Sequence, residues 1–178
     1  MTDEADAALP IPDGIRRDHI RAPGGWRRHA SPLSLAVFGS VILAGLTGVL
    51  GHERDWVGES AGQRLTVHAP EVTRNGEFLE IRVGVESQEP IDEVAIGVEA
   101  ALWEDMTVNT MIPAPTEELA EDGEFRFGFG PLEPGTAFDF KIDLQVNPDI
   151  VGGNEGTVTL YDGEEPLTAV DVSIAVLP

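Results

Sequence analysis

Hydrophobic and polar positions divide the chain into stretches of different character. Residues 1–14 show no regular hydrophobic period, residues 15–29 are rich in arginine, and an uncharged, largely apolar run extends from Ala30 to Gly51. From residue 64 onward, apolar residues recur at every second position between turn residues, which is typical of strands with one buried face. The pattern predicts a flexible basic tail at 1–30, a transmembrane helix at 31–51, a tether at 52–63 and a β-sandwich domain at 64–178.

The apolar run has the length of a membrane span. At ~1.5 Å per helical residue, the uncharged stretch covers roughly 30 Å of hydrocarbon, so we expect a single-pass helix. Pro32 lies at its start, where a first-turn proline is tolerated. A buried core helix is an alternative, although such helices are usually shorter. A cleaved signal peptide is another, with Val49-Leu50-Gly51 as a weak cleavage site.

Charged residues beside the run predict its orientation. Five arginines lie within residues 16–28, whereas Arg54 alone lies close on the other side. Because cytoplasmic flanks hold the excess of Lys and Arg, the N-terminus is expected inside the cytoplasmic membrane and the C-terminal domain in the periplasm or outside the cell. The predicted anchors at the two membrane interfaces are Trp26, Arg27, Arg28 and Trp56.

Small residues recur every fourth position along the predicted helix. They are Ala36, Ser40, Ala44 and Gly48. This spacing allows another helix to approach closely, which predicts a membrane-protein partner or a homo-oligomer formed through the helix. The alternative is that these residues are simply common in membrane helices.

Alternating apolar residues after residue 64 predict eight strands. Their approximate ranges are 64–69, 78–86, 94–103, 106–112, 125–129, 138–146, 158–160 and 170–176. Turn signals such as Asn75-Gly76, Asp122-Gly123 and Pro134-Gly135 separate several of them. Residues 116–120 are expected to form one helical turn. With no long helix between the strands, the predicted fold class is all-β, an antiparallel β-sandwich.

Small residues and a tryptophan share one face of the strand predicted at 94–103. This face carries Ala95, Gly97, Ala101 and Trp103. It is either covered, as in a central strand buried on both sides, or an exposed patch for a partner. Burial is the commoner case and is favoured here.

Two passages resemble those of a known superfamily. Arg74–Val83 and Leu132–Phe140 resemble the turn-then-strand passages of immunoglobulin-like and fibronectin-type-III-like domains. The second is similar to their L-x-P-G-T-x-Y turn, with Phe138 where tyrosine is usual. The resemblance implies an Ig-like β-sandwich for residues 64–178. It implies no particular activity, because this fold carries many functions.

Charge is divided unevenly along the chain. The whole protein has 32 acidic and 11 basic residues, a net charge of −21. Residues 1–30 hold five of each, so the remaining 27 acids and 6 bases all lie in residues 51–178. Such an acidic domain repels phosphate backbones, which argues against a nucleic-acid partner. The absence of cysteine excludes disulfides and thiolate sites.

No motif in a fitting context for catalysis or nucleotide binding is present. The chain has no P-loop, and Gly58-Glu-Ser-Ala-Gly62, which matches G-x-S-x-G, is followed by a predicted strand and not by the helix that this motif requires. We therefore predict no enzyme and no cofactor. No metal site is predicted either. The one weak candidate for Ca²⁺ is a set of oxygen-bearing side chains around Gly152-Gly153, namely Asn147, Asp149, Asn154 and Glu155.

These observations together predict a non-enzymatic, single-pass membrane protein. Its extracytoplasmic β-sandwich would act as an interaction or accessory module for another envelope or membrane protein. The alternative function is a Ca²⁺- or small-ligand-binding domain presented at the membrane surface.

Overall fold

The structure is a computed structural model that describes residues 25–48, 51–148 and 152–178, with side chains from Ser31 onward. It divides into two compact units, Met1–Thr47 and Gly48–Pro178. We describe each unit by itself.

The first unit contains helix α1, Gly25–Leu46. Large apolar side chains from Leu33 to Leu46 are 55–80% exposed, and they occur on all sides of the helix. Within the described residues, no helix is both long enough and apolar enough to cross a membrane. The predicted span at 31–51 is therefore not supported by the structure.

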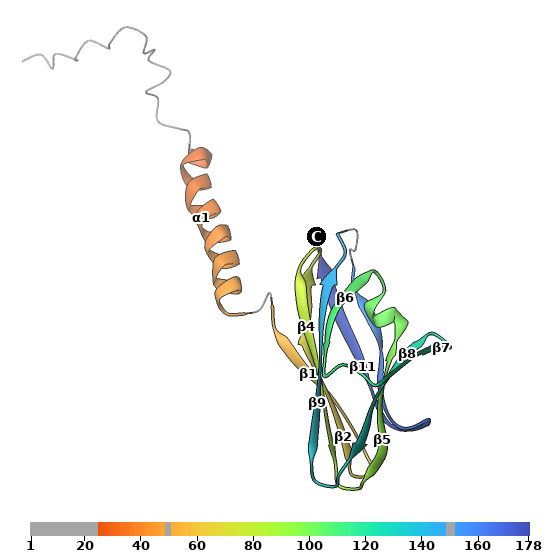
Figure 1. Cartoon of the computed structure of the whole chain (residues 1–178). Coiled ribbons are helices and arrows are strands. Elements are labelled where there is room, and N and C mark those ends of the chain that lie inside the picture. The colour runs from red at the N-terminus through yellow and green to blue at the C-terminus, as the bar shows by residue number, and fades with distance from the viewer. Residues whose placement is uncertain (1–24, 49–50, 149–151) are drawn as a thin grey trace, which may run out of the picture. The chain divides into compact units, whose positions relative to one another are not determined.

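The second unit consists of two packed β-sheets (Figure 1). The first sheet has the strand order β1-β2-β4-β9-β6, and the second has the order β3-β11-β10-β5-β8-β7. The strands are β1 Glu53–Ser60, β2 Gln63–Pro70, β3 Val72–Arg74, β4 Phe78–Ser87, β5 Ile91–Glu99, β6 Met106–Ile112, β7 Glu117–Glu121, β8 Glu124–Leu132, β9 Ala137–Val146, β10 Asn154–Asp162 and β11 Glu165–Leu177. A short 3₁₀ helix, η2 (Ala100–Trp103), follows β5. All pairings are antiparallel except that of β3 with β11. The predicted β-sandwich is thus confirmed.

Alternate residues of the strands fill the space between the sheets. In β4, for example, the predicted inward residues Leu79, Ile81, Val83 and Val85 are all at most 7% exposed. Phe140 of β9 is fully buried, and its ring centroid lies 6.0 Å from that of Phe127 in β8. Because β-strand side chains alternate between faces, the opposite faces of these strands are left for polar residues.

The predicted tether is wrong. Residues 53–60 form β1, which pairs with β2 from Glu53↔Pro70 to Ser60↔Gln63. Trp56 is only 8% exposed and belongs to the hydrophobic core, so it is not a membrane-interface anchor. The physical reason is strand alternation: Trp56 points toward the core and is the single buried residue of β1, whose other residues are exposed or half-buried.

The predicted helical turn at 116–120 is also wrong. Residues Glu117–Glu121 form β7, which pairs with β8 as a hairpin. Asp122 and Gly123 both have positive φ angles, 51° and 82°. A two-residue turn with positive φ at both positions matches the right-handed twist of paired strands. The hairpin is therefore favoured over the helical turn that the Glu-Leu-Ala sequence predicts.

The favoured interpretation of the strand at 94–103, a covered face, is confirmed for Ala95, Gly97 and Trp103 but not for Ala101, which is exposed. Val94 to Val98 are all buried, although the strand ends at Glu99 and continues as η2. The Glu124 carboxylate lies over the outer face of Gly97. A Cβ added at Gly97 would lie only 2.5 Å from the carboxylate carbon, so the absence of a side chain there makes room for Glu124. A side chain of the neighbouring strand thus covers this face.

Candidate functional site

A groove opens along one side of the sandwich, between β6 at the edge of one sheet and the β7–β8 hairpin at the edge of the other. We call it the side groove. Its volume is about 500 Å³. It is lined by Trp103, Met106, Val108, Asn109, Thr110, Met111, Ala114, Pro115, Glu118, Phe125 and Phe127. Most of these side chains are apolar, as is usual for sites that bind peptides or small molecules.

The floor of the side groove is continuous with the aromatic core. Trp103 makes edge-to-face contacts with Phe125 and Phe127, with ring centroids 5.7 and 5.8 Å apart. Phe127 in turn packs on Phe140 in the opposite sheet. Phe125 is still 39% exposed at the open side. An apolar group entering the groove would therefore extend the core.

Trp103 carries an unsatisfied donor. Its side chain is 6% exposed, and within the described residues its indole N–H is buried without an acceptor. Leaving a buried donor unpaired costs about 1–3 kcal/mol. The residue that carries this unpaired donor is one of those that line the side groove.

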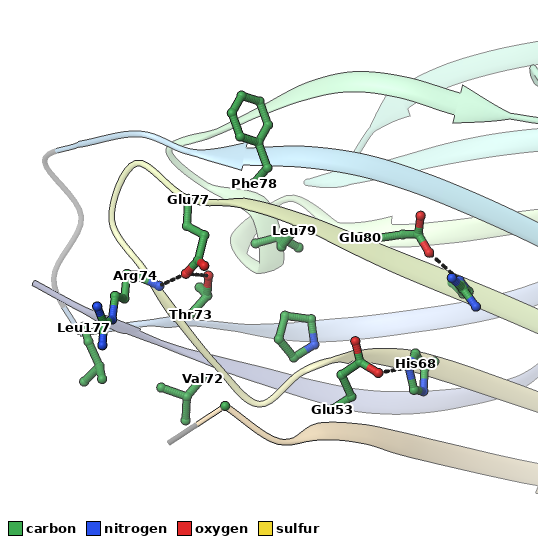
Figure 2. Close-up of a pocket in the computed structure, with 13 residues that line it drawn as sticks. Glu53, His68, Val72, Thr73, Arg74, Glu77, Phe78, Leu79, Glu80 and Leu177 are labelled. Atoms are coloured by element: carbon green, nitrogen blue, oxygen red, sulfur yellow. Dashed lines mark hydrogen bonds and ion pairs between the residues drawn. The ribbon is translucent and has the colours of Figure 1, made fainter. Parts of the chain in front are cut away.

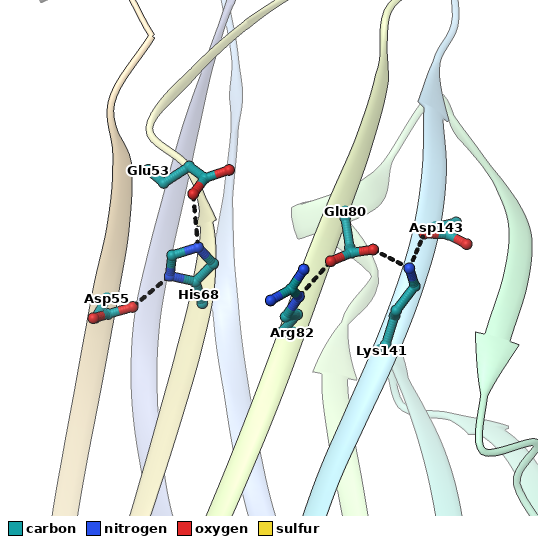
Figure 3. A network of polar contacts seen from close by, with 7 residues as sticks. All are labelled: Glu53, Asp55, His68, Glu80, Arg82, Lys141 and Asp143. Atoms are coloured by element: carbon teal, nitrogen blue, oxygen red, sulfur yellow. Dashed lines mark hydrogen bonds and ion pairs between the residues drawn. The ribbon is translucent and has the colours of Figure 1, made fainter. Parts of the chain in front are cut away.

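Outward-facing charges form a row across the first sheet (Figure 3). His68 of β2 lies between two carboxylates of β1: its Nδ1 is 2.6 Å from Asp55 and its Nε2 is 3.0 Å from Glu53. A carboxylate only accepts hydrogen bonds, so both contacts form together when the ring is protonated. The hydrogen bond to Asp55, helped by Glu53, raises the pKa of His68. With both nitrogens occupied, the ring has none left to activate a nucleophile.

The same row continues onto β4 and β9. Glu80 accepts hydrogen bonds from Lys141 and Arg82, and these two cations hold the pKa of its carboxyl below the usual value. Lys141 also lies 3.4 Å from Asp143. Figure 3 shows these side chains lying across adjacent strands. This arrangement ties the strands together and leaves little unpaired charge for a ligand.

A second hollow of about 450 Å³ lies where β2, β3 and β4 meet the end of β11 (Figure 2). Its charged lining residues are largely engaged with one another: Glu53 pairs with His68, and Glu77 accepts hydrogen bonds from Thr73 and from the backbone of Arg74. Most carboxylates of this end hollow are thus engaged, although no ion pair to the Arg74 side chain is formed among the described residues. The side groove, in contrast, exposes apolar surface.

The predicted helix-pairing residues do not all lie on the helix. Ala36, Ser40 and Ala44 share one face of α1, and the Ser40 hydroxyl donates to the Ala36 carbonyl at 2.8 Å. Gly48 lies beyond the last helical residue, with φ +74°. A left-handed glycine is a common helix terminator, so the face is shorter than the spacing alone predicts.

Other predicted site residues lie apart from the side groove. Trp26, Arg27 and Arg28 belong to the first turns of α1, but their side chains fall outside the described part of the chain, as does Asp149. Asn147 accepts a hydrogen bond from Thr107, and Asn154 donates to the Glu104 carbonyl at 2.7 Å. Glu155 lies exposed on β10. Among the described residues, no cluster of His, Asp or Glu is arranged to hold a metal ion.

The side groove does not follow from the sequence pattern. Alternation places Trp103 on an outer strand face, and it predicts only a weak strand for the segment that holds Met106 and Met111. The available signal is the run from Met106 to Ile112, which contains no charged residue in a domain that is otherwise densely acidic. Its significance depends on β6 lying at a sheet edge, which the sequence does not reveal.

Comparison with known proteins shows similarity of fold only. No protein-family model matches the chain, and no curated protein matches it. Among solved structures, it is similar to CaCohA2 from Clostridium acetobutylicum, with 12% identity over 66% of this chain and 92% of that one, at a TM-score of 0.46. CaCohA2 has also been crystallised in a complex with CaDoc0917(R16D). A non-cellulosomal cohesin from the archaeon Archaeoglobus fulgidus matches at 10% identity over 60% of this chain and 86% of that one, with a TM-score of 0.38. The C-terminal domain of wzt matches at 16% identity, over 72% of this chain and 74% of that one, with a TM-score of 0.35.

Proposed function

We propose that residues 51–178 form a non-enzymatic interaction module that binds another envelope or membrane protein through the side groove. The observation that carries this proposal is the groove itself. Val108, Ile112 and Phe125 expose apolar surface beside or within it, at 42%, 55% and 39%. Clustered exposed apolar residues on a soluble domain are typical of protein-interaction sites.

The membrane anchor is the second part of the proposal. No described helix meets the requirements of a span, so the anchor remains a prediction. Three observations support the anchor. The sequence from Ala30 to Gly51 is uncharged, and the 22-residue helix α1 overlaps most of this stretch. Five arginines lie on the N-terminal side of the stretch. Alkaline extraction of cell membranes tests it: an anchored chain stays in the pellet, and a peripheral one is released.

A matched pair of valines tests the interaction module. Val108 and Val57 are both about half exposed, at 42% and 49%, and both lie on edge strands of the same sheet. Val108 lines the side groove and Val57 does not. We expect Val108→Asp to abolish recovery of a partner that co-purifies with the intact chain from detergent-solubilised membranes.

The control is Val57→Asp, which should retain the partner. Circular dichroism checks that both variants are folded. The proposal is wrong if no protein co-purifies specifically with the intact chain, or if the Val108 variant recovers the same partner as the Val57 variant.

Binding of Ca²⁺ or a small ligand is the alternative function. The Gly152-Gly153 loop has positive φ angles of 127° and 130°, and Glu155 beside it is exposed. A titration of the full chain with millimolar Ca²⁺ tests this alternative. A rise in melting temperature would favour it, because a ligand that binds only the folded state stabilises that state.

A further inference from the structure

The four sheet edges of the domain are protected unequally. β1 carries Glu53, Arg54, Asp55 and Glu59, and β7 has three glutamates among five residues. β3 is only three residues long. Charges and short length are the usual ways in which an edge strand avoids pairing with another chain. β6 has seven residues and no charge, so it is the least protected edge.

We propose that an extended, basic segment of a partner protein adds to the β6 edge as a further strand and places apolar side chains in the side groove. This inference rests on the proposed function, because it specifies how the interaction module binds. Strand addition gives affinity through main-chain hydrogen bonds and specificity through pockets for alternate side chains. The uncharged β6 edge and the apolar side groove next to it provide both.

Geometry limits the added strand to a short one. The ladder between β6 and β9 shifts register between Val108 and Thr110, which leaves Asn109 unpaired as a bulge. A bulge bends the strand and interrupts pairing. An added segment would follow β6 for about three residues on either side of Asn109, and the groove would supply much of the binding energy.

The groove can adapt to such a segment. Met106 and Met111 are half-buried in its wall, and methionine side chains repack more readily than branched ones.

Charge determines what kind of segment fits. The domain has 27 acids and 6 bases, and five of those bases are engaged in ion pairs. Glu104 and Asp105 lie exposed directly before β6, and no ion pair to either is formed among the described residues. A second copy of this domain would bring like charge to the same edge. A segment carrying Lys or Arg is attracted instead.

Glu118 identifies the position of a cation in the segment. It lies directly opposite Phe127 in the β7–β8 pairing, on the face of the hairpin that lines the side groove. Its neighbour Glu117 lies on the other face and lines a separate hollow with Leu119. Both are exposed and have the same charge. They therefore form a matched pair for a test.

Two synthetic seven-residue peptides serve as probes, both with valine at alternate positions and either lysine or glutamate between them. Each is titrated against the full chain in detergent micelles, and binding is followed by hydrogen–deuterium exchange. We expect the lysine peptide to bind roughly tenfold tighter than the glutamate peptide and to slow exchange across Met106–Ile112. Glu118→Lys should remove or reverse the preference, and Glu117→Lys should preserve most of it.

Three results would overturn the inference: no binding of the lysine peptide at millimolar concentration, protection at a strand other than β6, or equal effects of the two lysine variants. In that last case Glu118 would act only as an inward charge that protects the edge. These outcomes are separate from the proposed function. A partner lost with Val108→Asp but insensitive to Glu118→Lys would support the interaction module and refute basic-strand addition.

Discussion

Replacing Trp56 by alanine tests whether the residue predicted to anchor the chain at a membrane is instead part of the core. A buried tryptophan removes roughly 150–250 Å² of surface from water. At ~25 cal/mol per Å², that area corresponds to roughly 4–6 kcal/mol, which is an upper estimate. The Arg54 guanidinium lies 5.4 Å from the Trp56 ring centroid and makes a cation–π contact with the ring. We expect Trp56→Ala to lower the free energy of unfolding by about 3–5 kcal/mol, as large-to-small core substitutions do.

Urea unfolding of the full chain in mild detergent, followed by circular dichroism, measures this change. The transition midpoint should fall while the dependence on urea stays the same. Phe78→Ala is the control, because Phe78 is 69% exposed and its loss should change stability by no more than about 0.5 kcal/mol. If Trp56→Ala and Phe78→Ala have equal, small effects, the packing of β1 onto the sandwich is wrong.

Three further predictions concern charge and backbone fit. Because the pKa of His68 is raised, its contribution to stability is complete below about pH 6.5 and is lost as pH rises through the raised pKa. After solvent screening, this contribution of His68 amounts to roughly 0.2–1 kcal/mol. His68→Gln should abolish the pH-dependent loss of stability measured by urea unfolding. An unchanged pH profile in this variant would refute the prediction. The melting temperature should rise with NaCl up to about 1 M, since salt screens repulsion among the excess acids; a fall would mean that the ion pairs dominate. Gly58→Ala should destabilise the domain by about 1–3 kcal/mol, because its Cβ would lie 2.5 Å from the Ala169 carbonyl oxygen. Gly84→Ala, with its nearest contact at 3.5 Å, should be neutral or slightly stabilising, and the reverse order would contradict the close approach of β1 to β11.

Strands with strict alternation were predictable from the sequence. β4 and β9 pair along nearly their whole length, from Phe78↔Gln145 to Glu86↔Ala137, and the apolar residues of their regular alternation face inward. The period of two is a local property of the chain, so it can be read without knowing the partners. The β-sandwich class follows from several such strands separated by turn residues.

Elements stabilised by distant contacts were not predictable in this way. β1 has one inward apolar residue, Trp56, and β7 has none that is buried. Each exists because a neighbouring strand offers backbone partners, and such pairing overrides local preference. The side groove follows the same logic. It requires η2 to bring Trp103 beside β6 and β8, and no local pattern encodes that arrangement.

A photo-crosslinking residue placed on the β6 edge in cells tests partner binding at this edge most directly. Thr110 lies on β6 beside the groove, and Thr136 lies exposed in the turn between β8 and β9. The same substitution at both positions gives a matched pair. We predict a discrete adduct from position 110 and none from position 136. The adduct should be attached through a lysine- or arginine-containing segment of one partner. Adducts from position 136 alone, or identical adducts from both positions, would contradict binding at the β6 edge.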